Sequence, residues 1–373
     1  MNIIILKNNI KEGLAIIAGA HKEGSHLPVL KNFLFTAQND IVRLVSTDLE
    51  LAIQYTISAK IITAGIAAIP FAVFSQIISS LSSERISFEH KGSALLVSSD
   101  NYKAKITTAN SDEYPLIPSI EESKARQFVF DQDVFIDGLS AVSSACQASD
   151  IRPELSGVYL AYKGGSLKLA ATDSFRLAEK IIPDKKYETG ISGDAACIIP
   201  IKTIQEVIRV FSLKKDGKIT VQFDDHQVLF ETKHISIISR LIDGKFPEYE
   251  GIIPKQYLTE AVLKTGDVVA AVRVTSSLSN RLHEVKFVID DILKNIQVIS
   301  MSQEFGESEY IIPAKIKGQA NKITFNWRFV LDGLKNIRTE NVFMGFNGED
   351  KATVFKSPDD ATLLYIVMPI KSA

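Results

Sequence analysis

The stretch that decides the fold is ATDSFRLAEK, residues 171–180, because its opening matches STD at 46–48, 125 residues earlier. At the same offset, HLPVLKNFLF (26–35) aligns with IRPELSGVYL (151–160), so that a proline and a leucine coincide. The pattern indicates an internal repeat, and therefore a chain built from similar structural units.

The segments on either side of these matches also correspond. NNIKEGLAIIAGAH (8–21) and DQDVFIDGLSAVSSACQ (131–147) precede them and carry apolar residues at helical spacing. IPFAVFSQIISSL (69–81) and IPIKTIQEVIRVF (199–211) follow them and predict an amphipathic helix after an Ile-Pro step. Alternating runs come next and predict antiparallel strands, namely RISFEH and ALLVSS in the first copy, and KITVQFDD and QVLFETK in the second. The copies close on DEYPLIP (112–118) and GKFPEYEGIIP (244–254).

A third copy is weaker. Its helices are predicted over 255–274 and 326–337, with strands at EVKFVID, NIQVISMSQ, SEYIIPAKI, VFMGFNG, KATVFK and ATLLYIVMPI. Each unit then reads as strand, helix, several strands, helix and several strands, an α+β fold. Short connections near 124 and 251 predict the domains 1–124, 125–251 and 252–373. Chance similarity of three α+β segments is the alternative.

Length and charge narrow the class of protein. A chain of 373 residues is too long for a single ordinary hydrophobic core, so two or three domains are predicted. A net charge of -2 is untypical of nucleic-acid binders, so DNA contact requires local Lys and Arg placement or geometry. Cys146 and Cys197 lack a CxxC partner and are interpreted as reduced, packed thiols.

Neither the N-terminal segment nor the apolar stretch at 61–78 predicts membrane insertion. MNIIILKNN has no basic lead and does not read as a signal peptide. Residues 61–78 are apolar, but they are short for a membrane span and are interrupted by Gly65, Pro70, Ser75 and Gln76. A strand ending near Pro70 and then a helix is the better interpretation, so we expect a cytoplasmic protein.

No catalytic or metal motif emerges, and no cofactor is expected. No two of the six histidines have metal-ligand spacing and none has a cysteine beside it; they are His21, His26, His90, His226, His234 and His283. His90 and His226 are expected at hairpin ends. A P-loop, a GxSxG motif and a GxGxxG after a strand are all missing.

Several polar clusters resemble active-site fragments but are better explained as turns. Gly164-Gly165-Ser166 lies between two strand-like runs and predicts a tight hairpin turn. Asp48 and Asp173 occupy equivalent repeat positions and are predicted to hydrogen-bond the local backbone. Asp224-Asp225 and Glu349-Asp350 read as polar turns between strands. A binding protein is favoured over an enzyme.

The order of five motifs resembles the beta subunit of bacterial DNA polymerase III, the replicative sliding-clamp family, over the whole length. The motifs are TDLELAI (47–53), RPELSGVYL (152–160), ATDSFRLAEK (171–180), SRLIDGKFPEYEGIIPK (239–255) and YIVMPI (365–370). The resemblance implies three clamp domains, each with two helices facing an inner channel and antiparallel sheets outside. It also implies a head-to-tail homodimer, a six-domain ring that encircles duplex DNA independently of its sequence.

The resemblance further implies a mostly apolar groove for short extended peptides of replicative polymerase, clamp loader and repair polymerases. The matching positions are Leu155, Thr172, Ser174, Phe175, Arg176, Leu177, Pro247, Ile252, Ala352, Ile366, Met368, Pro369 and Ile370. Core packing is an open alternative for Leu155 and Leu177. Ser174 and Phe175 depart from the family's usual Gly and His, which predicts a rim of different shape.

Other positions are implied to face DNA or a second subunit. The predicted DNA-facing cations, on modestly basic helices, are Lys11, Lys202, Arg209, Lys264, Arg328 and Lys335. Gly24 and Gly251 stand where the family often has Arg, which predicts looser DNA contact. The predicted dimer interface is Lys105, Ile106, Thr107, Ser277, Leu278 and Leu282, with Ile106 equally open to a core role.

Three hypotheses follow from the sequence. The first is a processivity ring, which predicts a dimer of about twice 41.1 kDa. The second is a protein-interaction scaffold without a DNA function, which predicts a monomer that still binds peptides. The third is an enzyme with an unrecognised site, for which Asp48 and Asp173 are the candidate carboxylates.

Overall fold

The computed structural model describes residues 1–24, 27–121, 123 and 125–371. Two positions discussed above lie outside the described residues: His26, one of the six histidines, and Lys124, the predicted end of the first domain. Each repeat has one order of elements: a strand, a helix, five strands, a second helix and three strands. The predicted α+β architecture with three similar repeats is therefore confirmed.

The bounds of the elements show how closely the repeats agree. The first contains β1(Asn2–Leu6), α1(Lys7–Ile17), β2(Asn32–Gln38), β3(Ile41–Thr47), β4(Leu51–Ser58), β5(Lys60–Thr63), β6(Gly65–Pro70), α2(Phe71–Ser80), β7(Arg85–Lys91), β8(Ala94–Ser98) and β9(Lys103–Thr107). The second contains β10(Arg126–Asp131), α3(Gln132–Ser143), β11(Gly157–Lys163), β12(Ser166–Thr172), β13(Arg176–Ile182), β14(Tyr187–Thr189), β15(Ala195–Pro200), α4(Ile201–Leu213), β16(Lys218–Phe223), β17(Gln227–Glu231) and β18(Ile235–Arg240). The third contains β19(Thr259–Lys264), α5(Thr265–Ser276), β20(Glu284–Asp290), β21(Asn295–Ser302), β22(Gly306–Pro313), β23(Lys315–Gly318), β24(Asn321–Asn326), α6(Trp327–Lys335), β25(Asn341–Phe346), β26(Thr353–Lys356) and β27(Leu363–Val367).

The chain forms two compact units, and the middle repeat contributes to both. The first unit is Met1–Asp133, Glu188–Ile191 and Gln205–Leu241, and the second is Val134–Tyr187, Ser192–Ile204 and Ile242–Ala373. The units follow spatial contact, whereas the predicted boundaries follow the sequence repeat. Those boundaries remain a prediction about the repeats.

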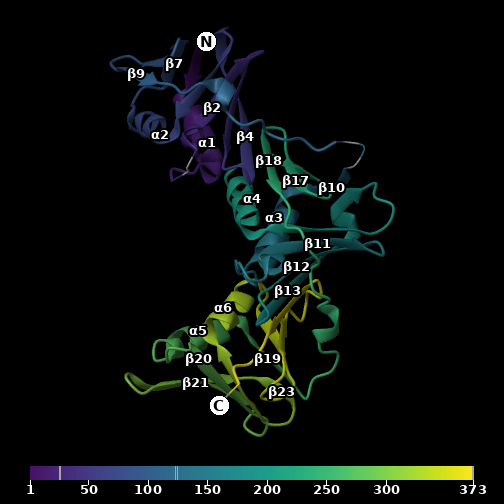
Figure 1. The fold of residues 1–373 in the computed structure, drawn as a ribbon. Coiled ribbons are helices and arrows are strands. Elements are labelled where there is room, and N and C mark those ends of the chain that lie inside the picture. Colours follow the sequence, from purple (N-terminus) through teal and green to yellow (C-terminus); the bar gives the residue numbers. More distant parts are fainter. Residues whose placement is uncertain (25–26, 122, 124, 372–373) are drawn as a thin grey trace. The chain divides into compact units, whose positions relative to one another are not determined.

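The first unit is built on two antiparallel sheets. Its nine-stranded sheet has the order β14-β10-β16-β17-β18-β4-β3-β2-β6, and its five-stranded sheet has the order β5-β1-β7-β8-β9. The pair β18–β4 joins a strand of the middle repeat to one of the first. Figure 1 shows α1 beside β4, on which it packs. The helix also packs on β3 and buries Ile10, Leu14 and Ile17.

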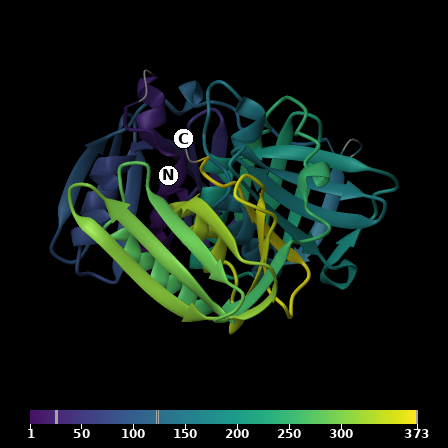
Figure 2. The same ribbon diagram turned by 90° about the horizontal axis from the view of Figure 1, so that it is seen from below.

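The second unit repeats this plan. Its nine-stranded sheet runs β15-β11-β12-β13-β27-β26-β25-β19-β23, and the four-stranded sheet runs β22-β21-β20-β24. The pair β13–β27 joins the middle repeat to the third, as β4–β18 joins the first to the middle. Helices α5 and α6 pack together, and Figure 2 shows the long β21–β22 hairpin with α5 behind it.

Local sequence explains several element ends. Gly164 and Gly165 have φ of +55° and +80° and form the two-residue loop between β11 and β12, as the hairpin prediction requires. Strand β6 ends at Pro70 and α2 starts at Phe71, which confirms the predicted strand-to-helix change. The side chain of Asn326 caps α6 by accepting a hydrogen bond from Arg328 N at 3.0 Å.

The predicted helix over 255–274 is wrong in its first half. Residues Thr259–Lys264 form β19, and α5 begins only at Thr265. Thr259, Ala261 and Leu263 are buried while their neighbours are not, which is the two-residue period of a strand. Ala, Leu, Glu and Lys favour helices intrinsically, but pairing with β23 and β25 overrides that preference.

Smaller corrections concern element ends. The strand β24, Asn321–Asn326, was missing from the predicted third repeat. The helix predicted from Asp131 begins at Gln132, because Asp131 is still paired with Lys218 in the sheet. Cys146, predicted within this helix, follows its end at Ser143, whereas Cys197 lies in β15.

Candidate peptide-binding site

A tight turn between β12 and β13 forms the centre of the predicted groove. One oxygen of Asp173 accepts hydrogen bonds from the backbone N–H of Phe175 at 2.9 Å and of Arg176 at 3.0 Å. Thr172 Oγ1 donates to the Arg176 carbonyl at 2.6 Å. Asp48 accepts from Glu50 N and Leu51 N in the same way. Both aspartates therefore organise turns, as predicted from the sequence.

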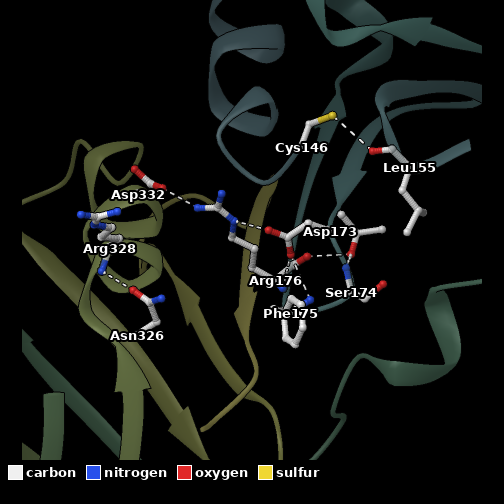
Figure 3. Close-up of polar contacts among 10 residues, drawn as sticks. Cys146, Leu155, Asp173, Ser174, Phe175, Arg176, Asn326, Arg328 and Asp332 are labelled. Carbon is white, nitrogen blue, oxygen red and sulfur yellow. Dashed lines mark hydrogen bonds and ion pairs between the residues drawn. The ribbon is translucent and has the colours of Figure 1, made fainter. Parts of the chain in front are cut away.

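Arg176 is buried beside the turn and links it to helix α6. Its side chain is 9% exposed, and Nε donates to Asp173 Oδ2 at 2.9 Å. Nη1 forms an ion pair with Asp332 of α6 (Figure 3). The guanidinium also lies 4.3 Å from the centre of the Phe329 ring. These contacts tie β13 to α6. Arg176 was predicted as a peptide contact, but its observed contacts are with residues of the protein that support the site.

An apolar cluster lies beneath the turn. Leu177 and Ile366, adjacent in the β13–β27 pair, pack with Phe246 and Tyr249 of the connecting segment. Ala352 packs against this cluster and is partly buried. The Tyr249 hydroxyl donates to Glu179 Oε2 at 2.5 Å, and burial raises its pKa far above the ordinary value. The floor of the site is therefore mostly apolar and contains one buried side-chain hydrogen bond.

The rim is apolar and open to solvent. Phe175 is 62% exposed and Met368 is 36% exposed, and Met368 N donates to the Phe175 carbonyl at 2.8 Å. Ile252 is also exposed, and Pro247 and Pro369 are half-buried. Exposed aromatic and methionine side chains above an apolar floor are typical of surfaces that bind peptides.

Two further contacts fix the edge of the site near Ser174. Ser174 takes φ of +76°, and its hydroxyl accepts a hydrogen bond from Arg152 Nη1 at 3.0 Å. Leu155 is buried, and its carbonyl accepts a hydrogen bond from Cys146 Sγ at 3.3 Å. Leu155 and Leu177 thus have the core role that the sequence left open for them.

Ile370 is directed to a different surface. Its backbone N–H donates to the Thr324 carbonyl at 2.8 Å, so the tail pairs with the outer edge of β24. Ile370 lines a hollow of about 340 Å³ together with Lys286, Lys322 and Lys371. Its role in peptide binding remains a prediction.

Burial makes Cys146 a poor nucleophile, which gives a test of this packing. Burial, and after it the nearby Asp173, raise the pKa of the thiol to about 12. At pH 8 we expect iodoacetamide to modify native Cys146 on the order of a thousandfold more slowly than an ordinary thiol. Peptide mapping by mass spectrometry measures this, with guanidinium-unfolded protein as control. Equal rates in both states would contradict the burial.

The predicted DNA-facing cations differ in their surroundings. Arg209 bonds the Ala15 and Ile16 carbonyls at the end of α1 and pairs with Glu206 at 2.7 Å, which is a structural role. Lys264 is the N-cap residue of α5 and not a helical residue. The remaining predicted cations lie on helices with exposed side chains: Lys11, Lys202, Arg328 and Lys335.

Two corrections reduce the predicted helix charge. Helix α5 holds only Asp267 and Arg273, so it has no excess of positive charge. Helix α6 ends at Lys335, and Arg338 beyond it pairs with Asp137 at 3.1 Å. The basic character of the helices is therefore weaker than the sequence indicated.

The predicted dimer residues lie at or near sheet edges. Ile106 is 7% exposed and pairs with Leu95, and its neighbours Lys105 and Thr107 on edge strand β9 are exposed. Ser277 caps α5, the helix that packs on edge strand β22. Leu278 is half-buried and Leu282 is exposed.

Sequence reasoning missed residues that complete the site. Phe246 and Tyr249 form part of its floor, Arg152 bonds Ser174, and Asp332 holds Arg176. An available signal was the FPEY sequence at 246–249, whose aromatics follow the spacing of a buried face. Within the described residues, no three His, Cys, Asp or Glu side chains are grouped to hold a metal ion. No described helix is long and apolar enough to cross a membrane.

Comparison with known proteins places every repeat in one family. Residues 1–118 match the N-terminal domain of the DNA polymerase III beta subunit, 129–248 match its central domain, and 250–371 match its C-terminal domain. The beta sliding clamp of Synechocystis sp. is 26% identical, over 100% of this chain and 99% of its own. That of Bacillus subtilis is 25% identical, over 100% of both chains.

Solved structures agree with these sequence matches. The DNA polymerase III beta subunit of Thermotoga maritima has a TM-score of 0.90 at 26% identity, covering 100% of both chains. The DNA polymerase sliding clamp of Bacillus subtilis has a TM-score of 0.93 at 25% identity, also covering 100% of both chains. From its repeats, its fold and these full-length matches, the chain belongs to the DNA polymerase III beta subunit family, the bacterial sliding clamps.

Proposed function

We propose that two copies of this chain close head to tail into a ring that encircles duplex DNA and tethers replication proteins to it. The observation that carries the proposal is the threefold recurrence of one α+β element order in a chain of the sliding-clamp family. A six-domain ring holds DNA by topology and is a processivity factor, not an enzyme. We expect it to act in the cytoplasm.

Weak electrostatic attraction suits this mechanism. The chain has a net charge of -2, and two cations, Arg209 on α4 and Arg338 after α6, are already engaged within the protein. A ring that slides needs phosphate contacts that are loose and independent of sequence, because tight ion pairs hold it in place. The modest charge therefore favours topological retention.

The experiment that tests the ring compares circular and linear DNA. After loading by a clamp loader, the protein is expected to stay on a nicked circular plasmid during gel filtration. It is expected to leave when a restriction enzyme cuts the circle. Equal retention on both forms would contradict topological binding. A monomer in solution that still binds peptides would favour a scaffold without a DNA function.

Two glycines offer a gain-of-function test of DNA contact. A Cβ added at Gly24 or Gly251 meets no atom within 4 Å, so arginine fits at either position. Gly24→Arg/Gly251→Arg is expected to tighten binding to short duplex DNA. Each new phosphate contact should steepen the slope of log K against log salt by about 0.9. Fluorescence anisotropy measures it. Gly190→Arg, equally open, is the control, and an equal effect there would argue against a specific DNA-facing position.

Ring closure requires two complementary edges, which we assign to β9 and β22. Strand β9 ends the five-stranded sheet, and β22 ends the four-stranded sheet, whose other edge strand, β24, accepts a hydrogen bond from Ile370. Lys103 and Lys105 are exposed along β9, and Glu307 and Glu309 are exposed along β22. Lysines on an edge strand also discourage aggregation. The acidic partner edge favours pairing between copies.

The predicted groove supplies the tether. An apolar floor below Phe175 and Met368 suits an extended peptide whose alternate side chains are apolar anchors. Polymerases, the clamp loader and repair polymerases are the partners that we propose for it. Arg176 and Ile370 contribute less directly than their neighbours, since one supports the floor and the other pairs with β24.

Truncating the rim is expected to weaken peptide binding. Phe175→Ala or Met368→Ala should each cost about 1 to 2 kcal/mol of binding free energy, because each removes exposed apolar area at the contact. The dimer should persist. Anisotropy of a fluorescein-labelled peptide with alternating leucines and a terminal phenylalanine measures the affinity. Ile292→Ala, an exposed apolar residue in another loop, is the control. Unchanged affinity in both variants would remove this rim from the site.

A further inference from the structure

We infer that the first unit carries a second version of the peptide-binding surface, whose charged rim, Glu50 and Arg240, excludes peptides with apolar anchors. Each chain would then accept one such peptide, at Phe175 and Met368. The inference rests on the proposed function of the second-unit surface, and it names the residues that decide between the two.

The backbone of the two surfaces is equivalent. In the first unit β4 pairs with β18 so that Ala52 lies opposite Ile238, and in the second β13 pairs with β27 so that Leu177 lies opposite Ile366. Beyond the pairs, Arg240 N donates to the Glu50 carbonyl at 3.0 Å. Met368 N donates to the Phe175 carbonyl at 2.8 Å in the corresponding place. The rim residues are therefore exact structural counterparts in their backbone bonding.

The turn before each rim is also the same. Leu49 has φ of +79° and Ser174 has φ of +76°, and in each case the backbone N–H donates to the threonine two residues earlier. Such a conformation is strained for a leucine, and two hydrogen bonds to the Asp48 carboxylate stabilise the turn around it. One local structure thus presents two different rims.

The floors have a common apolar character. Leu30 is buried at the position equivalent to Leu155, and Ala52 is buried at the position equivalent to Leu177. Tyr114, which corresponds to Phe246 before a proline, is buried and donates its hydroxyl hydrogen to the Val45 carbonyl at 3.2 Å. The two floors thus have buried apolar residues at three equivalent positions, with Ala52 as the smaller counterpart of Leu177.

The rims differ in charge. Glu50 and Arg240 have side chains 68% and 69% exposed, with Arg240 Nη1 at 3.7 Å from Glu50 Oε1. Covering them with an apolar peptide would remove water from both charges, and this desolvation opposes binding. Phe175 and Met368 instead gain from being covered. The cost of desolvating the charges at the first surface and the gain from apolar contact at the second together direct an apolar peptide to the second unit.

Exchanging the rims tests the inference. The probe is a fluorescein-labelled six-residue peptide with leucine at positions three and five, phenylalanine at position six and alanine elsewhere. Glu50→Phe/Arg240→Met is expected to raise the stoichiometry from one to two peptides per chain. Phe175→Glu/Met368→Arg is expected to weaken binding at the second unit by at least tenfold more than Phe175→Ala/Met368→Ala. Native mass spectrometry and anisotropy report the two quantities.

A matched control separates a shaped site from general adhesion. Arg126→Met/Asp225→Phe replaces another exposed ion pair of the first unit, at 2.8 Å, with the same apolar residues. It should bind one peptide. One peptide per chain in Glu50→Phe/Arg240→Met, or two in this control as well, would overturn the inference. Failure of the unmodified protein to bind the probe would instead contradict the proposed function of the second-unit surface.

Discussion

Replacing Arg176 with alanine is expected to lower the free energy of unfolding by about 3 kcal/mol. The substitution leaves the Asp173 carboxylate, whose side chain is 6% exposed, without its cation. It also removes the ion pair to Asp332 and the stacking on Phe329. Lysine should not rescue the loss, because one ammonium cannot bond two carboxylates and stack on a ring at once.

Chemical denaturation followed by circular dichroism measures this effect. Arg126→Ala is the control, since the exposed Arg126–Asp225 pair at 2.8 Å should contribute less than about 1 kcal/mol. Asp173→Asn/Arg176→Met should recover part of the loss, because neither charge is then left alone. An Arg176→Ala variant as stable as Arg126→Ala would show that the buried ion pair does not stabilise the fold.

Reversing the charge of strand β9 is expected to convert the proposed dimer into monomers. Lys103→Glu/Lys105→Glu places two acids beside Glu307 and Glu309 of the proposed partner edge. Like charges at an interface cost several kcal/mol, so the dissociation constant should rise by roughly a hundredfold or more. Sedimentation at low micromolar concentration should then give a species near 41.1 kDa instead of twice that mass.

A second pair of reversals separates this interface from a loss of folding. Adding Glu307→Lys/Glu309→Lys to the same chain restores opposite charges and should restore the dimer. Lys315→Glu/Lys317→Glu on β23, an edge strand of another sheet, is the matched control and should leave the dimer intact. A charge-reversed β9 variant that remains dimeric would place the subunit joint elsewhere.

The predictions from sequence were strongest where local patterning and tertiary structure agree. The hairpin at Gly164 and the turns at Asp48 and Asp173 are fixed by interactions within a few residues, and all are confirmed. Prediction was wrong at 259–264, because residues that favour a helix pair with two distant strands. Such pairing depends on partners that a local pattern does not contain.

The candidate site shows the same limit. Its members were named through a family resemblance, but the Arg176 side chain pairs with Asp332 and the Ile370 backbone N–H bonds the Thr324 carbonyl, and both partners lie far away along the chain. The charges predicted for the helix from 255 also fell, because only part of that segment is helical. The roles of Arg176 and Ile370 depend on their burial and on their hydrogen-bond and ion-pair partners.

The sequence by itself determined the repeat, the order of strands and helices in its first two copies, and the family, because these are properties of spacing and motif order along one chain. Only the tertiary structure decided which arginine forms buried ion pairs, which strands lie at the edges of the sheets, and which of two equivalent turns has an apolar rim. These depend on side chains brought together from distant segments by sheet pairing, and no local pattern contains that information.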